Sequence, residues 1–292
     1  MSVKFPAMSQ FISAAEEWLN TNTSMPREQR QALAEIVPVL LKDCSDSGQK
    51  IFSVAGPPGT GKSTLAGTCA AALESDRISS IVISLDDYYL PAADRQKLSR
   101  SEHPLFSVRG VPGTHDLDLL ITHLEQLSRP DHEDILMPQF DKSIDDRLDS
   151  PRIVKAGFVP ANIFIEGWIA GVPPQGTGAL LGPVNEFEEE QDPDSEWRCR
   201  VNSYLYDYFH ALDPFINCRW YLKAPDWESV IAWRWDQELN DQQSRFSSRL
   251  EIIEFLNYYQ RLCLHMHNSC TDWADVVINL DPAHLPKIEN TQ

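Results

Sequence analysis

The stretch Gly56-Pro57-Pro58-Gly59-Thr60-Gly61-Lys62-Ser63 decides the fold, because it matches the phosphate-binding pattern G-x-x-x-x-G-K-[ST] at every fixed position. An apolar run at 51–55 precedes it and a helical pattern at 64–73 follows. In such a strand–loop–helix unit, backbone N–H groups curl around a polyphosphate and the helix N-terminus points at it. A chance glycine turn is the alternative, but the chain has only 13 glycines in 292 residues. The stretch therefore predicts a site for a nucleoside triphosphate.

Each residue type in this loop has an expected task. Lys62 is expected to reach the β- and γ-phosphates, and the Ser63 hydroxyl is expected to bind Mg²⁺. ATP and Mg²⁺ are therefore the expected ligands. The other residues that we expect to bind the nucleotide are Gly56, Pro57, Pro58, Gly59, Thr60, Gly61 and Thr64.

Composition narrows the class of protein. Hydrophobic residues make up 42% and charged residues 23% of the chain, which is typical of globular proteins. No apolar run approaches the roughly eighteen residues of a membrane span, and the N-terminus lacks the pattern of a secretory signal. The six cysteines form no C-x-x-C pair, so neither a zinc site nor a disulfide framework is indicated. We therefore expect a cytoplasmic protein without a membrane partner.

The net charge of −18 argues against nucleic acid as a partner, because no basic stripe is available to neutralise phosphates. ATP and most phosphoryl acceptors are themselves anions. A locally positive cleft must therefore attract them within an acidic surface. The few basic residues near sequence motifs become the candidates for binding the acceptor.

Strand-like and helix-like segments alternate along the chain, which predicts an α/β fold of the P-loop NTPase type. Its sheet is expected to be mostly parallel, with helices on both faces. Residues 1–48 are expected to form an N-terminal helical extension, and 49–292 the P-loop domain. The segment 171–194, with its acidic run, is interpreted as a solvated, exposed insertion, and a regulatory contact is the alternative for the acidic run. Strands are expected at 51–55, 78–84, 135–137, 161–165, 218–222 and 275–280, and helices at 8–20, 27–42, 64–73, 116–127 (capped by Thr114), 196–212, 226–239 and 248–267.

Acidic residues follow two of these strands, and ligands of parallel sheets bind at the carboxyl ends of strands. Asp86 and Asp87 follow the strand at 78–84, and a carboxylate there could accept the proton of an attacking hydroxyl. Capping a turn, or holding Mg²⁺ through water, is the alternative for this pair. Glu166 ends the strand at 161–165 and is a candidate for the metal shell. A single acid at this position favours transfer to an acceptor over hydrolysis.

Two loops carry unusual densities of functional side chains. The loop 109–116 contains Arg109 and His115, and the loop 138–147 contains Asp141, Lys142 and Arg147. Either loop alone is more often a structural turn than a site. At the same end of one sheet, they are expected to form the walls of an acceptor pocket.

In this order, the motifs resemble those of the plant-type D-glycerate 3-kinases and their bacterial and fungal relatives. These enzymes belong to the wider phosphoribulokinase, uridine kinase and pantothenate kinase group. The motifs are the phosphate loop, Ser-Leu-Asp-Asp-Tyr-Tyr, Arg-Gly-Val-Pro-Gly-Thr-His-Asp, Pro-Gln-Phe-Asp-Lys-Ser and Phe-Ile-Glu-Gly-Trp. The resemblance covers roughly residues 50–285.

The resemblance implies roles for individual residues. Asp86 would be the base, Glu166 the strand-end acid, and Arg234 an arginine on a helical lid at about 223–250 that meets the transferred phosphate. Lys62 would complete the catalytic group. One departure lies before Arg147, where plant-type sequences have a longer, glycine-rich stretch. The residues expected to contact the acceptor are Asp86, Tyr89, Arg109, His115, Asp141, Lys142 and Arg147.

These observations predict an ATP-dependent kinase that acts on a hydroxyl of a small metabolite, with D-glycerate as the first choice. A nucleoside, a pantothenate-like acid or another sugar acid is the closest alternative. For a nucleoside, Tyr88, Tyr89 or Phe140 could supply a stacking surface. A regulator that binds ATP without transferring phosphate is the alternative from a different class. The sequence does not indicate an oligomeric state.

Overall fold

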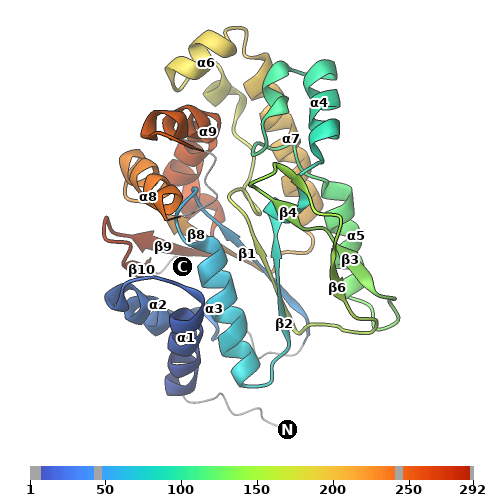
Figure 1. The fold of residues 1–292 in the computed structure, drawn as a ribbon, viewed down its shortest axis with the longest axis vertical. Coiled ribbons are helices and arrows are strands. Elements are labelled where there is room, and N and C mark those ends of the chain that lie inside the picture. Colours follow the sequence, from blue (N-terminus) through green and yellow to red (C-terminus); the bar gives the residue numbers. More distant parts are fainter. Residues whose placement is uncertain (1–7, 43–47, 241–245, 290–292) are drawn as a thin grey trace.

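A computed structural model describes residues 8–42, 48–240 and 246–289, and a twisted sheet lies at its centre (Figure 1). Within these residues, six strands follow the order β10-β9-β8-β1-β7-β2. Every neighbouring pair is parallel except β9 and β10, which are antiparallel. This confirms the expected α/β fold with a mostly parallel sheet. The strands are β1 (Lys50–Ala55), β2 (Ser80–Ser84), β7 (Asn162–Glu166), β8 (Cys218–Lys223), β9 (Val276–Leu280) and β10 (Pro286–Glu289).

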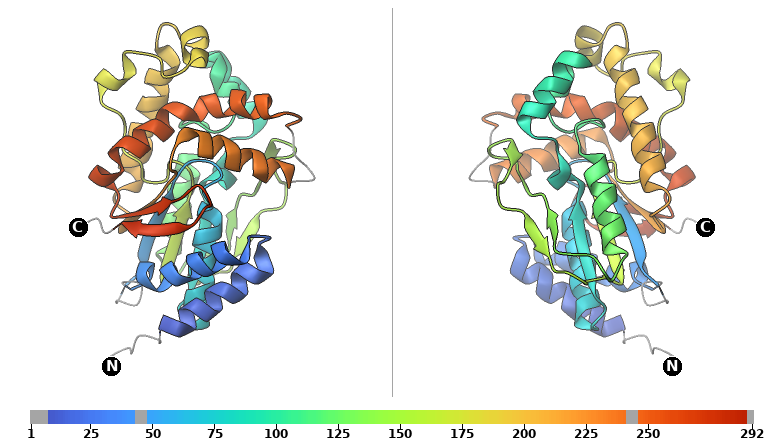
Figure 2. Two further views of the ribbon diagram at one scale, coloured as in Figure 1. Left: turned by 90° about the vertical axis from the view of Figure 1, so that its left-hand side faces the viewer. Right: turned by 90° about the vertical axis from the view of Figure 1, so that its right-hand side faces the viewer.

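Helices cover both faces of this sheet, as Figure 2 shows from two sides. One face packs against α1 (Met8–Asn22), α2 (Arg27–Leu40) and α3 (Lys62–Ser75). The other packs against α5 (Leu117–Leu127), α7 (Glu196–Leu212) and α9 (Arg249–Trp273). A further helix, α8 (Trp227–Leu239), lies against α9.

The central strands are apolar on both faces because successive side chains point to opposite sides of a strand. Ile163 and Ile165 of β7 belong to the core beneath α5, α7 and α9. Phe164, between them, belongs to the core beneath α1–α3 and stacks on Phe52 of β1 at 5.3 Å. The sheet is therefore enclosed, and its strand ends are where polar chemistry can be placed.

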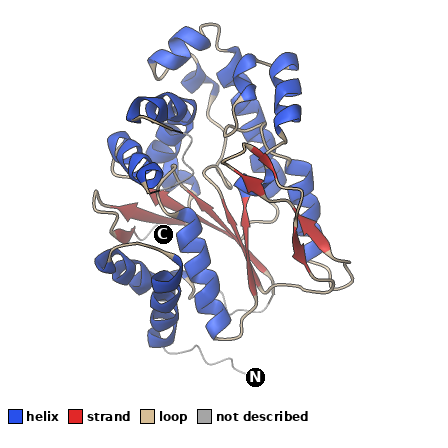
Figure 3. Cartoon of the chain, viewed as in Figure 1, coloured by secondary structure: helices blue, strands red, loops and turns tan. Residues whose placement is uncertain are grey.

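Among the smaller elements, helices α4 and α6 and the β4–β5 pair lie beyond the carboxyl ends of the strands, whereas β3 and β6 lie beside β2, where Arg152 donates to the Val82 carbonyl (Figure 3). The expected strand at 135–137 exists, but it pairs with β6 outside the main sheet. The helix expected from 248 to 267 continues to Trp273. These elements are α4 (Ala92–Ser101), α6 (Glu186–Gln191), β3 (Ile135–Met137), β4 (Phe140–Asp141), β5 (Asp146–Arg147), β6 (Arg152–Val154) and the 3₁₀ turns Leu85–Tyr88, Pro104–Ser107 and Thr177–Leu180.

The prediction that Thr114 caps α5 is wrong. The side chain of Asp116 accepts a hydrogen bond from the backbone N–H of Leu119 at 3.2 Å, which is the contact of an N-cap residue. The Thr114 hydroxyl instead donates to the Val111 carbonyl at 2.7 Å and accepts from the Gly110 N–H. It therefore folds the preceding loop.

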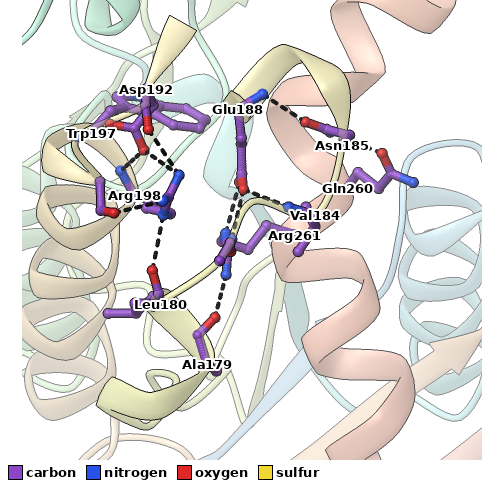
Figure 4. A network of polar contacts seen from close by, with 12 residues as sticks. Ala179, Leu180, Val184, Asn185, Glu188, Asp192, Trp197, Arg198, Gln260 and Arg261 are labelled. Carbon is purple, nitrogen blue, oxygen red and sulfur yellow. Dashed lines mark hydrogen bonds and ion pairs between the residues drawn. The ribbon is translucent and has the colours of Figure 1, made fainter. Parts of the chain in front are cut away.

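The interpretation of 171–194 as a solvated loop is wrong for its central residue, Glu188 (Figure 4). Glu188 is fully buried, and its two carboxylate oxygens accept hydrogen bonds from Arg261 of α9 at 2.7 and 2.6 Å. Arg261 also donates to the Ala179 carbonyl. A second buried pair, Arg198 with Asp192, fixes the end of the segment at 3.1 Å. These buried ion pairs therefore attach the segment to α7 and α9. Glu186, Glu189 and Glu190 are exposed, as expected.

Parts of the expected regions lie outside the described residues. These are 1–7 and 43–47 of the N-terminal extension, and 241–245 (in the lid region at 223–250) and 290–292 of the P-loop domain. Among the helices that are described, none combines the length and the apolar character that crossing a bilayer requires.

Candidate active site

The phosphate loop follows β1 and is shaped by its glycines. Gly59 and Gly61 adopt φ angles of +82° and +86°, a left-handed conformation that favours glycine. The Thr60 hydroxyl and the Lys62 ammonium both donate to the Pro57 carbonyl, at 2.8 and 2.9 Å. Helix α3 starts directly behind the loop, so its positive end faces the same space. The loop therefore has the shape that the sequence predicts for binding a polyphosphate.

A cavity of about 580 Å³ runs along the carboxyl edge of the sheet and is lined by the loop from Pro58 to Thr64, whereas the predicted Gly56 and Pro57 lie outside the lining. The strand order places the loop in the middle, with β2 and its Asp86 on one side and β9–β10 on the other. Of the predicted site residues outside the loop, the cavity is lined by Asp86, Tyr89, Arg109, Lys142, Glu166 and Arg234.

Asp86 lies on a 3₁₀ turn at the end of β2, where its carboxylate pairs with the Lys142 ammonium at 2.5 Å. Burial would raise the pKa of this carboxyl. The charge and hydrogen bond of Lys142, together with the charge of Lys62, outweigh burial and hold the pKa well below its usual value. Asp86 is therefore ionised at neutral pH and able to accept a proton.

Asp87 has a different position. Its carboxylate accepts the backbone N–H of Phe140 at 3.1 Å, which holds strand β4 in place. It does not line the cavity. Of the two neighbouring acids, only Asp86 is placed to meet a ligand in this cavity.

Two buried tyrosines of the cavity lining form a hydrogen-bonded network with Asp86. The Tyr89 hydroxyl donates to the Asp86 carboxylate and contacts the Tyr259 hydroxyl. Tyr259 comes from α9 and donates to the Arg109 carbonyl at 3.3 Å. Burial raises the pKa of both phenols, so both remain protonated donors. Tyr259 was not predicted, because nothing in the local sequence of a long helix marks it as part of this network.

Glycines in the predicted motifs make room for these contacts. A Cβ on Gly110 would lie 2.1 Å from the Tyr259 hydroxyl, and one on Gly113 would lie 2.5 Å from the Tyr204 ring. A Cβ on Gly167 would meet Leu85 at 2.5 Å, on the turn that carries Asp86. The loop before α5 therefore packs closely against tyrosine side chains of α9 and α7, and the loop after β7 packs closely against the Leu85 side chain of the turn after β2.

Glu166 ends β7 beside the phosphate loop, with 6% of its surface exposed. Its carboxylate accepts hydrogen bonds from the hydroxyls of Ser63 and Ser84. Burial and the neighbouring Asp86 raise its pKa, and the Lys62 charge only partly offsets them. Burial also lowers the pKa of Lys62.

This donor set fits Mg²⁺. A hydroxyl and two neighbouring carboxylates are hard oxygen ligands, which Mg²⁺ prefers alongside water and phosphate oxygens. Ser63 and Glu166 would hold the ion, and its charge would offset the repulsion between Glu166 and Asp86 that raises the pKa of Glu166.

The predicted basic residues separate into two groups. Lys142 and Arg109 line the cavity. Arg109 is 8% exposed and is ion-paired with Asp145, a partner that the sequence did not suggest. Arg147 is not in the lining. Its guanidinium donates to the Tyr89 carbonyl at 2.8 Å and to Asp116 at 3.2 Å, so it holds the backbone behind the site.

His115 and Asp141 also stay out of the cavity lining. The His115 ring stacks on Tyr89 at 4.3 Å, and burial lowers its pKa to about 3, so it is neutral. Asp141 accepts hydrogen bonds from the backbone and hydroxyl of Ser143, at 2.8 and 2.6 Å, and so closes the β4–β5 turn.

Arg234 lies on α8 and lines the cavity beside the phosphate loop. Its guanidinium pairs with Glu238 and donates to Gln237 at 2.7 Å, so it runs along its own helix. A Cβ added to Gly59 would lie 3.3 Å from the Arg234 backbone nitrogen. The middle of the phosphate loop and α8 are therefore in close contact.

No model of a known protein family matches the chain. A fission-yeast protein from Schizosaccharomyces pombe, "Uncharacterized kinase mug58", is 32% identical over 222 residues, which cover 72% of this chain and 78% of the relative. The chain belongs to that kinase family. With a phosphate loop in place, it is an ATP-dependent kinase of the P-loop type.

Two further relatives extend the comparison of this P-loop kinase. The chloroplastic D-glycerate 3-kinase of Arabidopsis thaliana is 30% identical over 230 residues, 75% of this chain, and the match spans about half, 48%, of the plant enzyme. A solved structure, D-glycerate 3-kinase from Cryptococcus neoformans, superposes with a TM-score of 0.68 at 23% identity and covers 98% of this chain and 99% of that one. At that identity, the structure supports the fold alone.

Proposed function

We propose that this kinase transfers the γ-phosphoryl group of ATP to the terminal hydroxyl of D-glycerate. The observation that carries the proposal is the position of Asp86. Its ionised carboxylate lies beside Lys62 of the phosphate loop, between Lys142 and Tyr89. A base for a hydroxyl and a cation for a carboxylate thus stand next to each other, and D-glycerate carries both groups.

In the proposed reaction, Asp86 accepts the proton of the acceptor hydroxyl as its oxygen bonds to the γ-phosphorus. The bond from that phosphorus to the β–γ bridging oxygen breaks, and ADP leaves with the electron pair. Lys62 and Arg234 neutralise charge on the transferring group. When bound at Ser63 and Glu166, Mg²⁺ supplies further positive charge to the phosphates.

The acceptor carboxylate would bind Lys142 and Arg109, which line the cavity next to Asp86. Lys142 is more than half exposed and can turn from Asp86 to an entering carboxylate. The predicted contacts of Arg147, His115 and Asp141 with the acceptor would then be indirect. These residues support Tyr89, the backbone and the β4–β5 turn.

A nucleoside acceptor is less well supported. Of the three aromatic residues considered for stacking, only Tyr89 lines the cavity, and His115 covers its ring. Phe140 lies beneath the guanidinium of Arg109, whose carbon is 5.7 Å from the ring centroid.

The experiment compares D-glycerate, pantothenate and uridine as acceptors and measures ADP release in the presence of Mg²⁺. The proposal predicts acceptor-dependent release with D-glycerate and background release with uridine. If ADP is released only with another acceptor, the chain is still a kinase, but D-glycerate is not its substrate. Release that responds only to a protein partner would favour the regulator instead.

A further inference from the structure

Arg109, one of the two cations proposed for the acceptor carboxylate, lies between two cavities. It lines the cavity with the phosphate loop and also a second cavity of about 820 Å³. Asp145 lines the second cavity and not the first, so its carboxylate meets Nη1 of Arg109 from the side away from the acceptor. Among the described residues, Nε and Nη2 of Arg109 have no hydrogen-bond partner. One edge of the guanidinium is therefore available to a ligand.

A buried arginine holds Asp145 in turn. Arg95 of α4 is 1% exposed, and its Nη2 contacts the other carboxylate oxygen of Asp145 at 3.1 Å and the carbonyl of Asp145 at 2.6 Å. Nε of Arg95 donates to the Leu90 carbonyl at 3.2 Å, and Nη1 donates to the Ser107 carbonyl at 3.1 Å. These two carbonyls lie shortly after the turn with the proposed base and shortly before the proposed cation. Arg95 therefore ties Asp145 to both segments of the acceptor site.

The backbone and the charge of Asp145 suit this position. It lies in the turn between β4 and β5 with a φ of +58°, a left-handed conformation that aspartate and asparagine adopt more readily than most residues. Burial would raise the pKa of its carboxyl, but the hydrogen bond and charge of Arg109 and the charge of Arg95 outweigh burial and lower it. Asp145 is therefore ionised between the two arginines.

The charges of this group indicate where a ligand can bind. Two guanidinium groups and one carboxylate give Arg95, Asp145 and Arg109 one net positive charge together. All three guanidinium nitrogens of the buried Arg95 already contact protein oxygens, so an anion can meet the surplus charge only at Arg109. A carboxylate accepts two parallel hydrogen bonds from the edge of a guanidinium group, which requires that the edge be held in a fixed orientation.

We propose that Asp145 is a positioning residue for the acceptor: it holds Nη1 of Arg109, so that the edge formed by Nε and Nη2 receives the acceptor carboxylate. This rests on the proposed function, because it requires an acceptor that carries a carboxylate. Asp145 does not touch the acceptor. It fixes the carboxylate end, and the hydroxyl at the matching distance from that end then meets Asp86.

Asp145→Asn is the test, because asparagine tolerates the left-handed turn and lacks the negative charge. If Arg109 acted through its charge alone, loss of a nearby negative charge would lower the KM for D-glycerate. Loss of positioning has the opposite sign. The KM for D-glycerate should rise about tenfold, because the charge-assisted hydrogen bonds lose their fixed geometry. The KM for ATP and the release of ADP without acceptor should stay within about twofold, because neither involves the acceptor carboxylate.

Asp146→Asn is the matched control. Asp146 is the half-buried neighbour of Asp145, and its carboxylate accepts the Ala92 N–H of α4 at 3.2 Å, but it lines neither cavity. A general loosening of the turn would raise the KM for D-glycerate in both variants, whereas positioning predicts a rise in Asp145→Asn only. Arg109→Lys provides a second control, because lysine keeps the charge and has no edge to hold. Adding Asp145→Asn to Arg109→Lys should raise the KM for D-glycerate by less than about twofold.

Asp145→Glu repeats the test if Asp145→Asn does not fold, since glutamate keeps the charge beside Arg95. Its extra methylene displaces the carboxylate and should raise the KM for D-glycerate at least about threefold. The proposal is overturned if the folded variant has an unchanged or lower KM for D-glycerate, or an equal rise in the KM for ATP. It is also overturned if Asp146→Asn has the same effect, or if the full effect persists in Arg109→Lys. A parent chain without D-glycerate-dependent ADP release would instead contradict the proposed function, and this proposal with it.

Discussion

At the scale of single residues, Asp86 and Asp87 are neighbours with identical side chains, but their positions give them different contacts. Asp86 faces the cavity and pairs with Lys142, whereas Asp87 accepts the Phe140 N–H. The sequence predicted that an acid at this strand end matters, because the strand and its carboxyl end are local features. Which of the two enters the cavity depends on the 3₁₀ turn that follows the strand.

Asp86→Asn should lower kcat by about 10²-fold or more, the typical contribution of a general base. The Kd of MgATP should change little, because the proton transfer matters only in the transition state. Steady-state kinetics and calorimetry would measure the two effects. Asp87→Asn is the control and should leave kcat within a few-fold. A larger loss of kcat in Asp87→Asn would mean that the roles are reversed.

Lys142→Met tests whether Lys142 lowers the pKa of Asp86, and the pH dependence of kcat/KM is the measurement. Lys142 holds the pKa of Asp86 low, so its removal should raise that pKa. Because only ionised Asp86 accepts a proton, the acid limb of kcat/KM should move to higher pH. The exposed Lys155, paired with Asp134 away from the cavity, provides the control variant Lys155→Met. An unchanged acid limb in Lys142→Met would assign that limb to another group.

At the scale of elements, α9 links the catalytic turn to the segment 171–194. It supplies Tyr259 to the hydrogen-bonded network of Asp86 and Arg261 to the buried Glu188. Neither contact could be predicted, because each joins residues far apart in the chain and one helix offers many polar positions. The phosphate loop was predictable because its pattern is contiguous and its glycine φ angles are local requirements.

Tyr259→Phe removes a hydroxyl from this network without changing the core volume. We expect kcat to fall about tenfold, which corresponds to the roughly 1.4 kcal/mol that one hydrogen bond can contribute. The KM for ATP should stay within about twofold, since Tyr259 acts through Tyr89. Tyr258→Phe, its half-buried neighbour, is the control. Equal losses in both variants would indicate a general effect on α9 instead.

Glu188→Gln should destabilise the fold by about 3 kcal/mol, because it leaves the Arg261 charge buried without its partner. Glu189→Gln, at the exposed next position, should change the free energy of unfolding by less than about 0.5 kcal/mol. Urea denaturation followed by circular dichroism would measure both values. Similar values for the two variants would show that the buried pair does not anchor the segment.

At the scale of the whole molecule, an acidic chain places the basic side chains of its candidate site at one edge of the sheet. The net charge is −18, yet Lys62, Lys142, Arg109 and Arg234 all line one cavity. The sequence predicted this edge, because parallel strands place their carboxyl ends together. It did not predict β10, a short antiparallel strand, or the part of the cavity bounded by the N-terminal helices.

The most direct test of the central claim identifies the product formed from D-glycerate and MgATP by phosphorus NMR. The account predicts one phosphorylated product, with the phosphate on the terminal hydroxyl, formed by the parent chain and at least about 10²-fold more slowly by Asp86→Asn. Phosphate on the other hydroxyl would contradict the proposed placement of the acceptor. ADP with free phosphate and no glycerate product, or equal rates for the two chains, would contradict the assignment of Asp86 as the base that directs transfer.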